Sequence, residues 1–416
     1  MTQPLMTQQP TAADLTTTAA PAGAAPALSE RYQQVMMNAF GGPKRVFVRG
    51  EGCHVWDDAG TKYLDLLSGL AVTALGHAHP AVLSAITSQL STLGHVSNFF
   101  ATPAQVTLAE KLASLVAPGA EPGTARVFFT NSGTEANEAA FKLTRLTGRT
   151  RIIAMEGSFH GRTMGALAIT ANPTYREPFE PLPGEVTFVP YGDAEALAAA
   201  VDEHTAAVVI EPIQGENGVV VPPEGYLAKA RELCDAAGAL LWFDEVQTGM
   251  GRTGRWLASE GVQPDLVTLA KGLGNGFPVG ACVGIGRAAT LLQPGQHGTT
   301  FGGNPVAAIA GLAVIGVIER DGLLENATAR GEQLAAEVLD LADPLVVEVR
   351  GAGLLRGIVL SEPVGPEVVD ALLASGFIVN APRPNVIRVA PPLIITEQQI
   401  SDFVRALSVA LNGIRR

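Results

Sequence analysis

The sequence predicts an α/β protein with a large domain on a mainly parallel sheet and a smaller α+β domain. From about residue 125 onward, short apolar runs alternate with amphipathic stretches, as strands alternate with helices in this class. The apolar runs lack polar alternation, which is typical of strands covered on both faces. Over 416 residues the composition is 47% hydrophobic and 16% charged, which suits large buried cores in two or three domains.

The N-terminal region differs in composition from the rest. Residues 1–28 are rich in Thr, Ala, Pro and Gln and carry one charged residue, Asp14, so we expect a disordered tail and neither a signal peptide nor a transit sequence. Residues 29–75 are expected to join the small domain, residues 76–305 to form the large cofactor-binding domain, and residues 306–416 to form the C-terminal small domain.

Six apolar runs predict the buried strands of the large sheet. They are RVFFTN (126–131), RIIAME (151–156), AAVVIEPI (206–213), LLWFDEV (240–246), DLVTLAK (265–271) and VGACVGI (279–285). Helices are expected over TEANEAAFKLTRL and over EGYLAKARELCDAAG, which Gly238 is suited to end. After Gly303, a long apolar helix and the β-like segments LVVEVRG, LLRGIVL and NVIRVA predict the smaller unit, which ends near Leu411.

Charge and cysteine content exclude several classes of function. The chain has 28 basic and 40 acidic residues, a net charge of −12, which argues against nucleic acid or a membrane surface as the partner. No apolar run reaches the roughly 18 residues that a membrane span needs. Cys53, Cys234 and Cys282 are an odd number with no close pair, so we expect no disulfide framework, no cysteine metal site and a cytoplasmic location.

Polar residues stand at the carboxyl ends of predicted strands, where open α/β sheets bind ligands. Ser132 and Glu135 after RVFFTN predict a capping box, and Gly133 between them allows a ligand to approach the backbone. Such a helix N-terminus can hold a phosphate. Asp244 ends the run LLWFD. Taken alone, each feature is equally compatible with an ordinary helix or turn cap.

Lysine is scarce, and one of the six lysines occupies an unusual place. Five of them lie in polar loops or on amphipathic helical patterns, where a solvated ammonium is expected: Lys44, Lys62, Lys111, Lys142 and Lys229. Lys271 ends an apolar strand and enters the loop GLGNGFP. At the edge of a dry site the pKa of a lysine falls, which favours imine chemistry with a carbonyl. The non-catalytic alternative is a lysine whose side chain extends to solvent beside a flexible loop.

A phosphate cradle, a carboxylate and a lysine at neighbouring strand ends together match the requirements of pyridoxal 5′-phosphate. Its phosphate needs a helix N-terminus, its ring nitrogen a carboxylate and its aldehyde a lysine. No other common cofactor asks for all three. The combination therefore predicts a pyridoxal-phosphate enzyme.

The order of the motifs resembles that of the class III aminotransferases, which are pyridoxal-phosphate enzymes of fold type I. The resemblance covers nearly the whole chain after the tail, and it is strongest to family members that act on N-acetylornithine in arginine biosynthesis. It rests on VWDDAGTKYLDLLSGLAVTALGHAHP, NSGTEANEAAFKL, FHGRTMGAL, VIEPIQGENGV, FDEVQTGMGRTG, LAKGLGNGFPVGA, HGTTFGGNP and IRVAPPL, in that order.

The resemblance implies a role for individual residues. Lys271 is implied to be the catalytic lysine that binds the cofactor covalently and moves the proton, and Asp244 to be the catalytic carboxylate at the ring nitrogen. Phe159 is implied to stack on the ring and Gln247 to bond its phenolic oxygen. The implied cofactor-binding set is Ser132, Gly133, Thr134, Phe159, Asp244, Val246, Gln247, Lys271 and Thr300, and no metal is expected.

The resemblance also implies substrate-binding residues and a partner subunit. Arg162 is implied to bind the substrate carboxylate, with Thr299 as a further contact. Arg388 is implied to bind a second carboxylate, and to pair with Glu216 when the substrate has none. Thr300 is implied to reach the phosphate of a neighbouring subunit, hence a homodimer with shared active sites. One departure from the family is Asn217, after QGE, where Gly or Ala is commoner.

The expected reaction transfers the terminal amino group of N-acetylornithine to 2-oxoglutarate and gives N-acetylglutamate 5-semialdehyde and glutamate. Ornithine-using relatives place a tyrosine ahead of the first strand, whereas residues 38–43, NAFGGP, contain none. A free α-ammonium group would therefore lack its partner. The alternative is another class III ω-aminotransferase, acting on ornithine, 4-aminobutyrate, succinylornithine or succinyl-diaminopimelate.

Two further motifs give weaker indications. Residues 284–289, GIGRAA, match a dinucleotide fingerprint and favour a nicotinamide-dependent dehydrogenase, but the acidic residue expected about 20 positions later is missing. His77 and His79 have no third ligand nearby and are expected to be structural, with Pro80 beginning a helix. A third possibility, a non-catalytic binding module on the same fold, would leave Lys271 unmodified.

Overall fold

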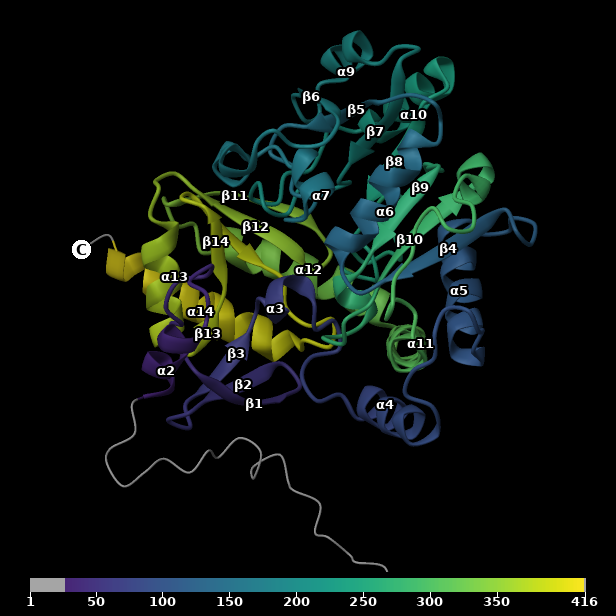
Figure 1. The fold of residues 1–416 in the computed structure, drawn as a ribbon. Helices are drawn as coiled ribbons and strands as arrows, with labels where there is room; N and C mark the ends of the chain where they lie inside the picture. The colour runs from purple at the N-terminus through teal and green to yellow at the C-terminus, as the bar shows by residue number, and fades with distance from the viewer. Residues whose placement is uncertain (1–26, 415–416) are drawn as a thin grey trace, which may run out of the picture.

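The computed structural model describes residues 27–414, and these form three sheets with helices packed around them (Figure 1). All but the last two residues of the predicted tail lie outside the described residues. Among the helices of the described range, none is long and apolar enough to cross a membrane.

The large sheet has seven strands in the order β4-β10-β9-β8-β7-β5-β6. Strand β10 runs antiparallel to both neighbours, while the pairs among β5 to β9 are parallel, so the predicted mainly parallel sheet is confirmed. All six predicted strands are present, and β6 is an additional edge strand. The bounds are β4 (Ala125–Thr130), β5 (Arg151–Met155), β6 (Glu185–Val189), β7 (Thr205–Ile210), β8 (Leu240–Asp244), β9 (Leu266–Leu269) and β10 (Gly280–Ile285).

Helices cover both faces of this sheet, which explains its uninterrupted apolar strands. Alternate residues of each strand point to opposite faces. Trp242 of β8 packs in the cluster that includes α6 (Gly133–Arg145), and its neighbour Phe243 packs in the cluster that includes α10 (Tyr226–Ala237). Gly238 ends α10 in the left-handed conformation, as its position after the helical pattern predicts.

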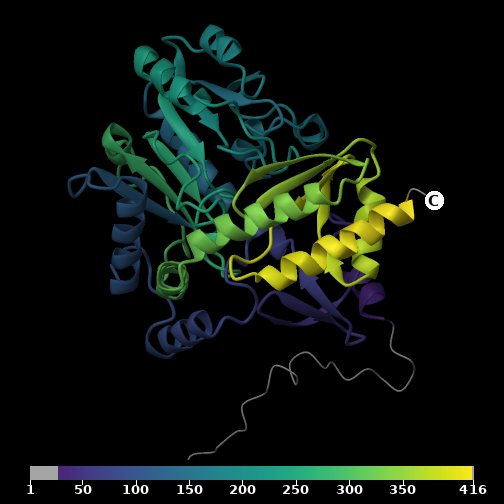
Figure 2. The ribbon, with the colours of Figure 1, turned by 180° about the vertical axis from the view of Figure 1, so that it is seen from behind.

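Two smaller sheets lie beside the large one (Figures 1 and 2). The first joins the N-terminal strands β1 (Phe47–Glu51), β2 (His54–Asp57) and β3 (Lys62–Asp65) to β13 (Phe377–Ile378) from far along the chain. The second, called the small sheet below, has the order β11-β12-β15-β14, with β11 (Val346–Ala352), β12 (Leu355–Leu360), β14 (Asn380–Arg383) and β15 (Val386–Val389). Helix α12 (Leu323–Asp340) contacts β11 and α14 (Glu397–Ile414), which contacts α13 (Gly365–Ala374).

The apolar helix predicted after Gly303 is α11 (Pro305–Arg320), which packs against α4 (Pro80–Thr92) and α5 (Pro103–Val116). The short element α3 (Ser68–Ala71) is a left-handed turn, since all four of its residues have positive φ. The remaining helices are α2 (Leu28–Val35), α7 (Met164–Ala168), α8 (Pro173–Arg176), α9 (Ala194–Ala200), and the short 3-10 turns η1 (Glu177–Phe179), η2 (Lys271–Leu273) and η3 (Gly286–Thr290).

Candidate active site

A pocket of about 360 Å³ lies at the carboxyl ends of the parallel strands. Its polar groups come from the residues that follow β4, β7, β8 and β9, which is where open α/β sheets bind ligands. Ten of the thirteen predicted site residues line it: Ser132, Gly133, Thr134, Phe159, Arg162, Glu216, Asp244, Val246, Gln247 and Lys271. Segments as far apart in the sequence as Ser132 and Lys271 therefore meet here.

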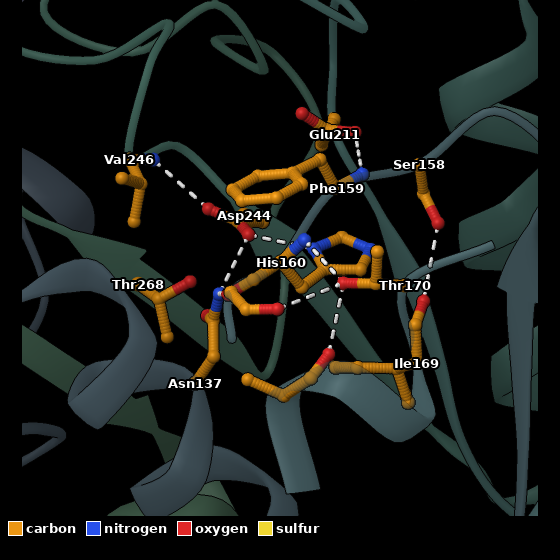
Figure 3. Close-up of polar contacts among 12 residues, drawn as sticks. Asn137, Ser158, Phe159, His160, Ile169, Thr170, Glu211, Asp244, Val246 and Thr268 are labelled. Atoms are coloured by element: carbon orange, nitrogen blue, oxygen red, sulfur yellow. Dashed lines mark hydrogen bonds and ion pairs between the residues drawn. The ribbon is translucent and has the colours of Figure 1, made fainter. Parts of the chain in front are cut away.

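Asp244, the last residue of β8, is buried and held by three donors (Figure 3). Its Oδ2 accepts hydrogen bonds from Asn137 Nδ2 at 2.8 Å and from His160 Nδ1 at 2.6 Å, and its Oδ1 accepts one from Val246 N at 3.0 Å. Because a carboxylate has about four lone-pair sites, one acceptor site is left for a ligand. The carboxylate is thus fixed and still able to receive a proton donor from the pocket.

Asn137 and His160 were not among the predicted site residues. Asn137 follows Gly133 by four positions on α6 and so lies on the same helix face, a spacing that could have identified it. Asn137 also donates to the backbone oxygen of His160 at 2.6 Å, so one amide group contacts both Asp244 and the backbone of the residue that carries the imidazole. His160 Nε2 is buried without a hydrogen-bond partner among the described residues.

Lys271 follows β9 and begins η2 with φ of +44°. A left-handed backbone is uncommon for a residue with a side chain and concentrates at functional sites. Burial lowers the pKa of the Lys271 amine, and the Arg388 guanidinium acts in the same direction, while Glu216, Asp244 and Glu211 oppose it. At a given pH, a larger fraction of the Lys271 amine is therefore uncharged and nucleophilic than in a solvated lysine.

The first turn of α6 forms one wall of the pocket. Ser132 Oγ caps it by accepting from Glu135 N at 3.3 Å. The expected capping box is only half correct, because the Glu135 carboxylate accepts from Asn131 N at 2.7 Å instead of turning back to Ser132. A Cβ at Gly133 would lie 2.7 Å from Val246 Cγ1, so the helix start and the end of β8 approach too closely for a side chain there.

Phe159 and Arg162 stand on the segment that crosses the pocket after β5. Phe159 N donates to Glu211 Oε2 at 3.1 Å (Figure 3). The Phe159 ring packs edge-on against Tyr175. The Arg162 guanidinium lies over the Tyr175 ring, with Cζ 3.5 Å from the centroid. Arg162 is exposed, and no acidic side chain within residues 27–414 forms an ion pair with it. It is therefore available to an anion from solution.

Glu211 is a third residue that the sequence analysis missed. It follows β7 directly, lines the pocket and is fully enclosed. Burial raises its pKa well above the usual value, and the nearby Asp244 carboxylate raises it further. A buried acidic side chain with a raised pKa in a cleft is typical of functional sites. The signal in the sequence was the Glu-Pro that ends the run AAVVIEPI.

Arg388 of β15 is buried and reaches the pocket residues from the small sheet. Its Nη1 donates to Glu216 Oε1 at 2.5 Å and to Gln247 Oε1 at 3.1 Å, and its Nε donates to Asn380 Oδ1. Burial alone raises the pKa of Glu216, but the Arg388 charge and hydrogen bond lower it overall. Arg388 Nη2 is buried and has no partner among residues 27–414. The arginine can thus accept a further anionic ligand.

Thr299 and Thr300 do not lie in this pocket. They line a separate and larger hollow of about 1470 Å³ that is formed by the segments around residues 95–99 and 294–302 and by α5 and β4. Within the described part of one chain, the structure therefore does not bring these two threonines together with the other eleven residues.

Two weaker motifs have structural explanations. His77 Nε2 lies 2.8 Å from Asp65 Oδ2, and His79 caps α4, which Pro80 begins as predicted. In residues 27–414 no cluster of His, Cys, Asp and Glu could hold a metal ion. The GIGRAA segment runs from the end of the antiparallel strand β10 into the short turn η3, so the βαβ unit of a dinucleotide fingerprint is missing. The dehydrogenase interpretation is therefore wrong.

Comparison with known proteins gives a consistent result. The family model described as aminotransferase class-III matches residues 37–411. The acetylornithine aminotransferase of Streptomyces coelicolor is 57% identical over 383 residues, 91% of this chain and 94% of that protein. Among solved structures, the ornithine aminotransferase of Toxoplasma gondii aligns with a TM-score of 0.88 and 31% identity over 93% and 94% of the two chains. The acetylornithine aminotransferase of Elizabethkingia anophelis aligns with a TM-score of 0.81 and 35% identity over 92% and 98%.

Proposed function

The chain belongs to the class III aminotransferases, and from this we propose that it transfers the terminal amino group of N-acetylornithine to 2-oxoglutarate. The products are N-acetylglutamate 5-semialdehyde and glutamate, as in arginine biosynthesis. The observation that carries the proposal is the pocket in which Lys271, the fixed carboxylate of Asp244 and the first turn of α6 meet. The name and the 57% identity of the Streptomyces relative support the choice of donor.

The residues present fit pyridoxal 5′-phosphate. The free N–H groups at the start of α6, a helix of 13 residues, suit its phosphate, and the remaining acceptor site of Asp244 suits its protonated ring nitrogen. Val246 and Phe159 are suited to enclose the ring, and Gln247 to bond its phenolic oxygen. When bound, the cofactor supplies an aldehyde for the amine and an electron-withdrawing ring that stabilises negative charge on the substrate carbon.

The protein's own groups divide the remaining work. Lys271 presents an amine with a lowered pKa, so Nζ can act as a nucleophile and can take up and return a proton. Asp244, oriented by Asn137 and His160, keeps a fixed negative charge facing the pocket. Such preorganised charge stabilises charge that develops during reaction without reorganisation at that moment.

Two arginines suit the substrate carboxylates. Arg162 is exposed and lies over the Tyr175 ring at the pocket, where its guanidinium can donate to a carboxylate. Arg388 suits the second carboxylate of 2-oxoglutarate or glutamate. N-acetylornithine has only one carboxylate, and Glu216 then neutralises Arg388. Because Arg388 can pair either with Glu216 or with a substrate carboxylate, one site can bind both N-acetylornithine and 2-oxoglutarate.

We propose a homodimer with shared active sites. Thr299 and Thr300 line a hollow that no other part of the described chain fills, and Phe99 is among its lining residues. Phe99 is 93% exposed and Phe301 58% exposed. Apolar residues gathered around such a hollow mark an interaction surface. A second copy of the chain is the occupant that would also bring Thr300 to a phosphate.

The cysteines support a cytoplasmic location. Cys53, Cys234 and Cys282 are buried and unpaired, and burial raises the pKa of each thiol to about 12. Unpaired, unreactive thiols are usual in reducing compartments.

A panel of amino donors with 2-oxoglutarate as acceptor tests the proposed reaction. We expect kcat/KM to be highest for N-acetylornithine. Ornithine should be lower by about 10- to 100-fold, because residues 38–43 offer no tyrosine for a free ammonium group and an unpaired charge in a closed site is costly. N-succinylornithine measures the tolerance for larger acyl groups, and 4-aminobutyrate should be slowest. An equal or higher kcat/KM for ornithine or 4-aminobutyrate would contradict the choice of donor.

A further inference from the structure

The loop from Gln214 to Val220 is attached to the small sheet through three consecutive residues. Arg388 of β15 donates to Glu216 Oε1 at 2.5 Å. Arg383 of β14 donates to Asn217 Oδ1 twice, from Nε at 3.1 Å and from Nη2 at 2.6 Å. Each of these residues of the loop is therefore held by its own arginine.

The third attachment involves the backbone. Arg350 of β11 donates from Nε at 3.0 Å and from Nη2 at 2.9 Å to Gly218 O. The next residue, Val219, is buried and has φ of +58°, a conformation that a β-branched residue adopts only when its surroundings impose it. The loop backbone is thus held firmly in a strained shape.

Asn217 also connects this loop to the segment that carries Phe159. Its Nδ2 donates to Gln214 Oε1 at 2.8 Å, and Gln214 Nε2 donates to Glu156 O at 2.8 Å. A Cβ at Gly157 would lie 2.3 Å from Asn217 Nδ2, so the asparagine packs directly on the backbone there. One amide therefore links the small sheet with the end of β5.

We propose that Asn217 is a positioning residue that fixes the loop backbone around Glu216. With a substrate that has one carboxylate, the Glu216 carboxylate stays paired with Arg388. With a dicarboxylate, only the Glu216 side chain rotates away from Arg388, and the loop backbone does not move. This inference rests on the proposed function. Arg388 is buried and needs a counter-charge in both situations. Rotation of Glu216 breaks one hydrogen bond to the small sheet, whereas movement of the whole loop would also break the four from Arg383 and Arg350.

Asn217→Ala should act in opposite directions on the two substrates. Without the amide, Glu216 is held less well over Arg388, so a dicarboxylate competes more easily and binds more tightly. A donor with one carboxylate then leaves Arg388 poorly neutralised and reacts less efficiently. Each effect should be about threefold to tenfold, the scale of one typical hydrogen bond within a protein. A general loss of order in the site would instead weaken the binding of the dicarboxylate and the reaction of the donor together.

The test uses the cofactor-loaded enzyme. Calorimetry gives the Kd of glutarate, an unreactive dicarboxylate, and single-turnover kinetics give kcat/KM separately for N-acetylornithine and for 2-oxoglutarate. We expect Asn217→Ala and Arg383→Gln each to lower the Kd of glutarate and kcat/KM for N-acetylornithine, and the double variant to add little. Arg356→Gln is the matched control, because within residues 27–414 the hydrogen bonds of Arg356 of β12 go to the carbonyls of Gly351 and Gly353 and not to the loop.

The outcomes separate the two proposals. An unchanged or raised Kd for glutarate in Asn217→Ala, or a parallel loss for both substrates, would overturn the positioning role. Failure of the wild-type enzyme to react with N-acetylornithine would overturn the proposed donor, while the glutarate Kd of Asn217→Ala still decides the role of Asn217.

Discussion

Asp244 is buried, accepts hydrogen bonds from three fixed donors and keeps one acceptor site open to the pocket. We therefore expect it to contribute through its negative charge. Asp244→Asn keeps the size of the side chain and removes that charge. We expect kcat to fall by about 10²-fold or more, the scale for a preorganised electrostatic partner, with cofactor still bound. Steady-state kinetics together with the cofactor content of the purified variant measure this. Unchanged kcat in a fully loaded variant would contradict the role.

Glu211 determines a pH dependence of stability. Its pKa is raised by burial and by Asp244, so between about pH 4.5 and the folded pKa the unfolded chain releases a proton that the folded chain retains. This contribution to stability is complete below the unfolded pKa and is lost as pH rises through the folded pKa. Glu211→Gln cannot titrate, so relative to wild type its unfolding free energy should gain about 1.4 kcal/mol per pH unit in that window.

Urea unfolding of the cofactor-free protein at pH 5 to 8 tests the role of Glu211. Glu203→Gln is the control, because Glu203 is an exposed side chain with no place in the pocket. Parallel stability curves for wild type and Glu211→Gln would show that Glu211 is ionised in the folded protein throughout this range.

At the level of single residues, the sequence singled out Lys271 and Asp244, which line the pocket, but not the groups that orient Asp244. Lys271 and Asp244 stand out because each ends an apolar strand. Asn137 and His160 act through contacts made only in the folded chain: Asn137 and Asp244 are 107 residues apart. Neither residue type is unusual where it occurs, so local pattern could not single them out.

The first turn of α6 depends on close packing against the end of β8. Gly133→Ala would place a Cβ 2.7 Å from Val246 Cγ1, and the helix start or Val246 must move. Overpacking of this kind costs about 1–3 kcal/mol, so cofactor affinity should fall by about tenfold or more. Equilibrium binding of pyridoxal phosphate, followed by absorbance, measures it. Gly316→Ala is the matched control, since nothing lies within 4 Å of a Cβ there; equal affinity in both variants would contradict the account.

Among the elements, buried strands were predictable and the edge strand was not. Strands β7 to β10 are buried along their whole length, which gives the apolar runs visible in the sequence. Strand β6 lies at the sheet edge and alternates exposed and partly buried residues, so it lacks such a run. The partner of β3 could not be predicted either, because β13 has two residues and comes from more than 300 positions later.

For the whole molecule, the homodimer proposal predicts complementation between inactive subunits. Lys271→Ala lacks the lysine, and Thr300→Trp blocks the site of its partner. A hybrid dimer of the two should contain one intact composite site and recover activity. Co-expression with two affinity tags, followed by isolation of hybrids, measures the recovery. Inactive hybrids of proven composition would show that each active site is formed within one chain.

The position of Thr299 and Thr300 is the part of the site that a single chain cannot explain. The sequence placed them in the site only through resemblance to the family. The structure puts them in a separate hollow. The other eleven predicted residues converge in or beside the pocket because strand order brings their carboxyl ends together. If these threonines serve a partner subunit, as we propose, the fold of one chain contains no such signal for them.

The central claim is that Lys271 is the residue that binds pyridoxal phosphate covalently. Borohydride reduction of the loaded enzyme, followed by proteolysis and mass spectrometry, tests it directly. We predict a single modified peptide that carries the cofactor on Lys271 and no modification in Lys271→Ala, with Lys142, a surface lysine that bonds to Gln296, unmodified in both. Stoichiometric label on any other lysine of the wild-type enzyme, or none at all, would contradict the account.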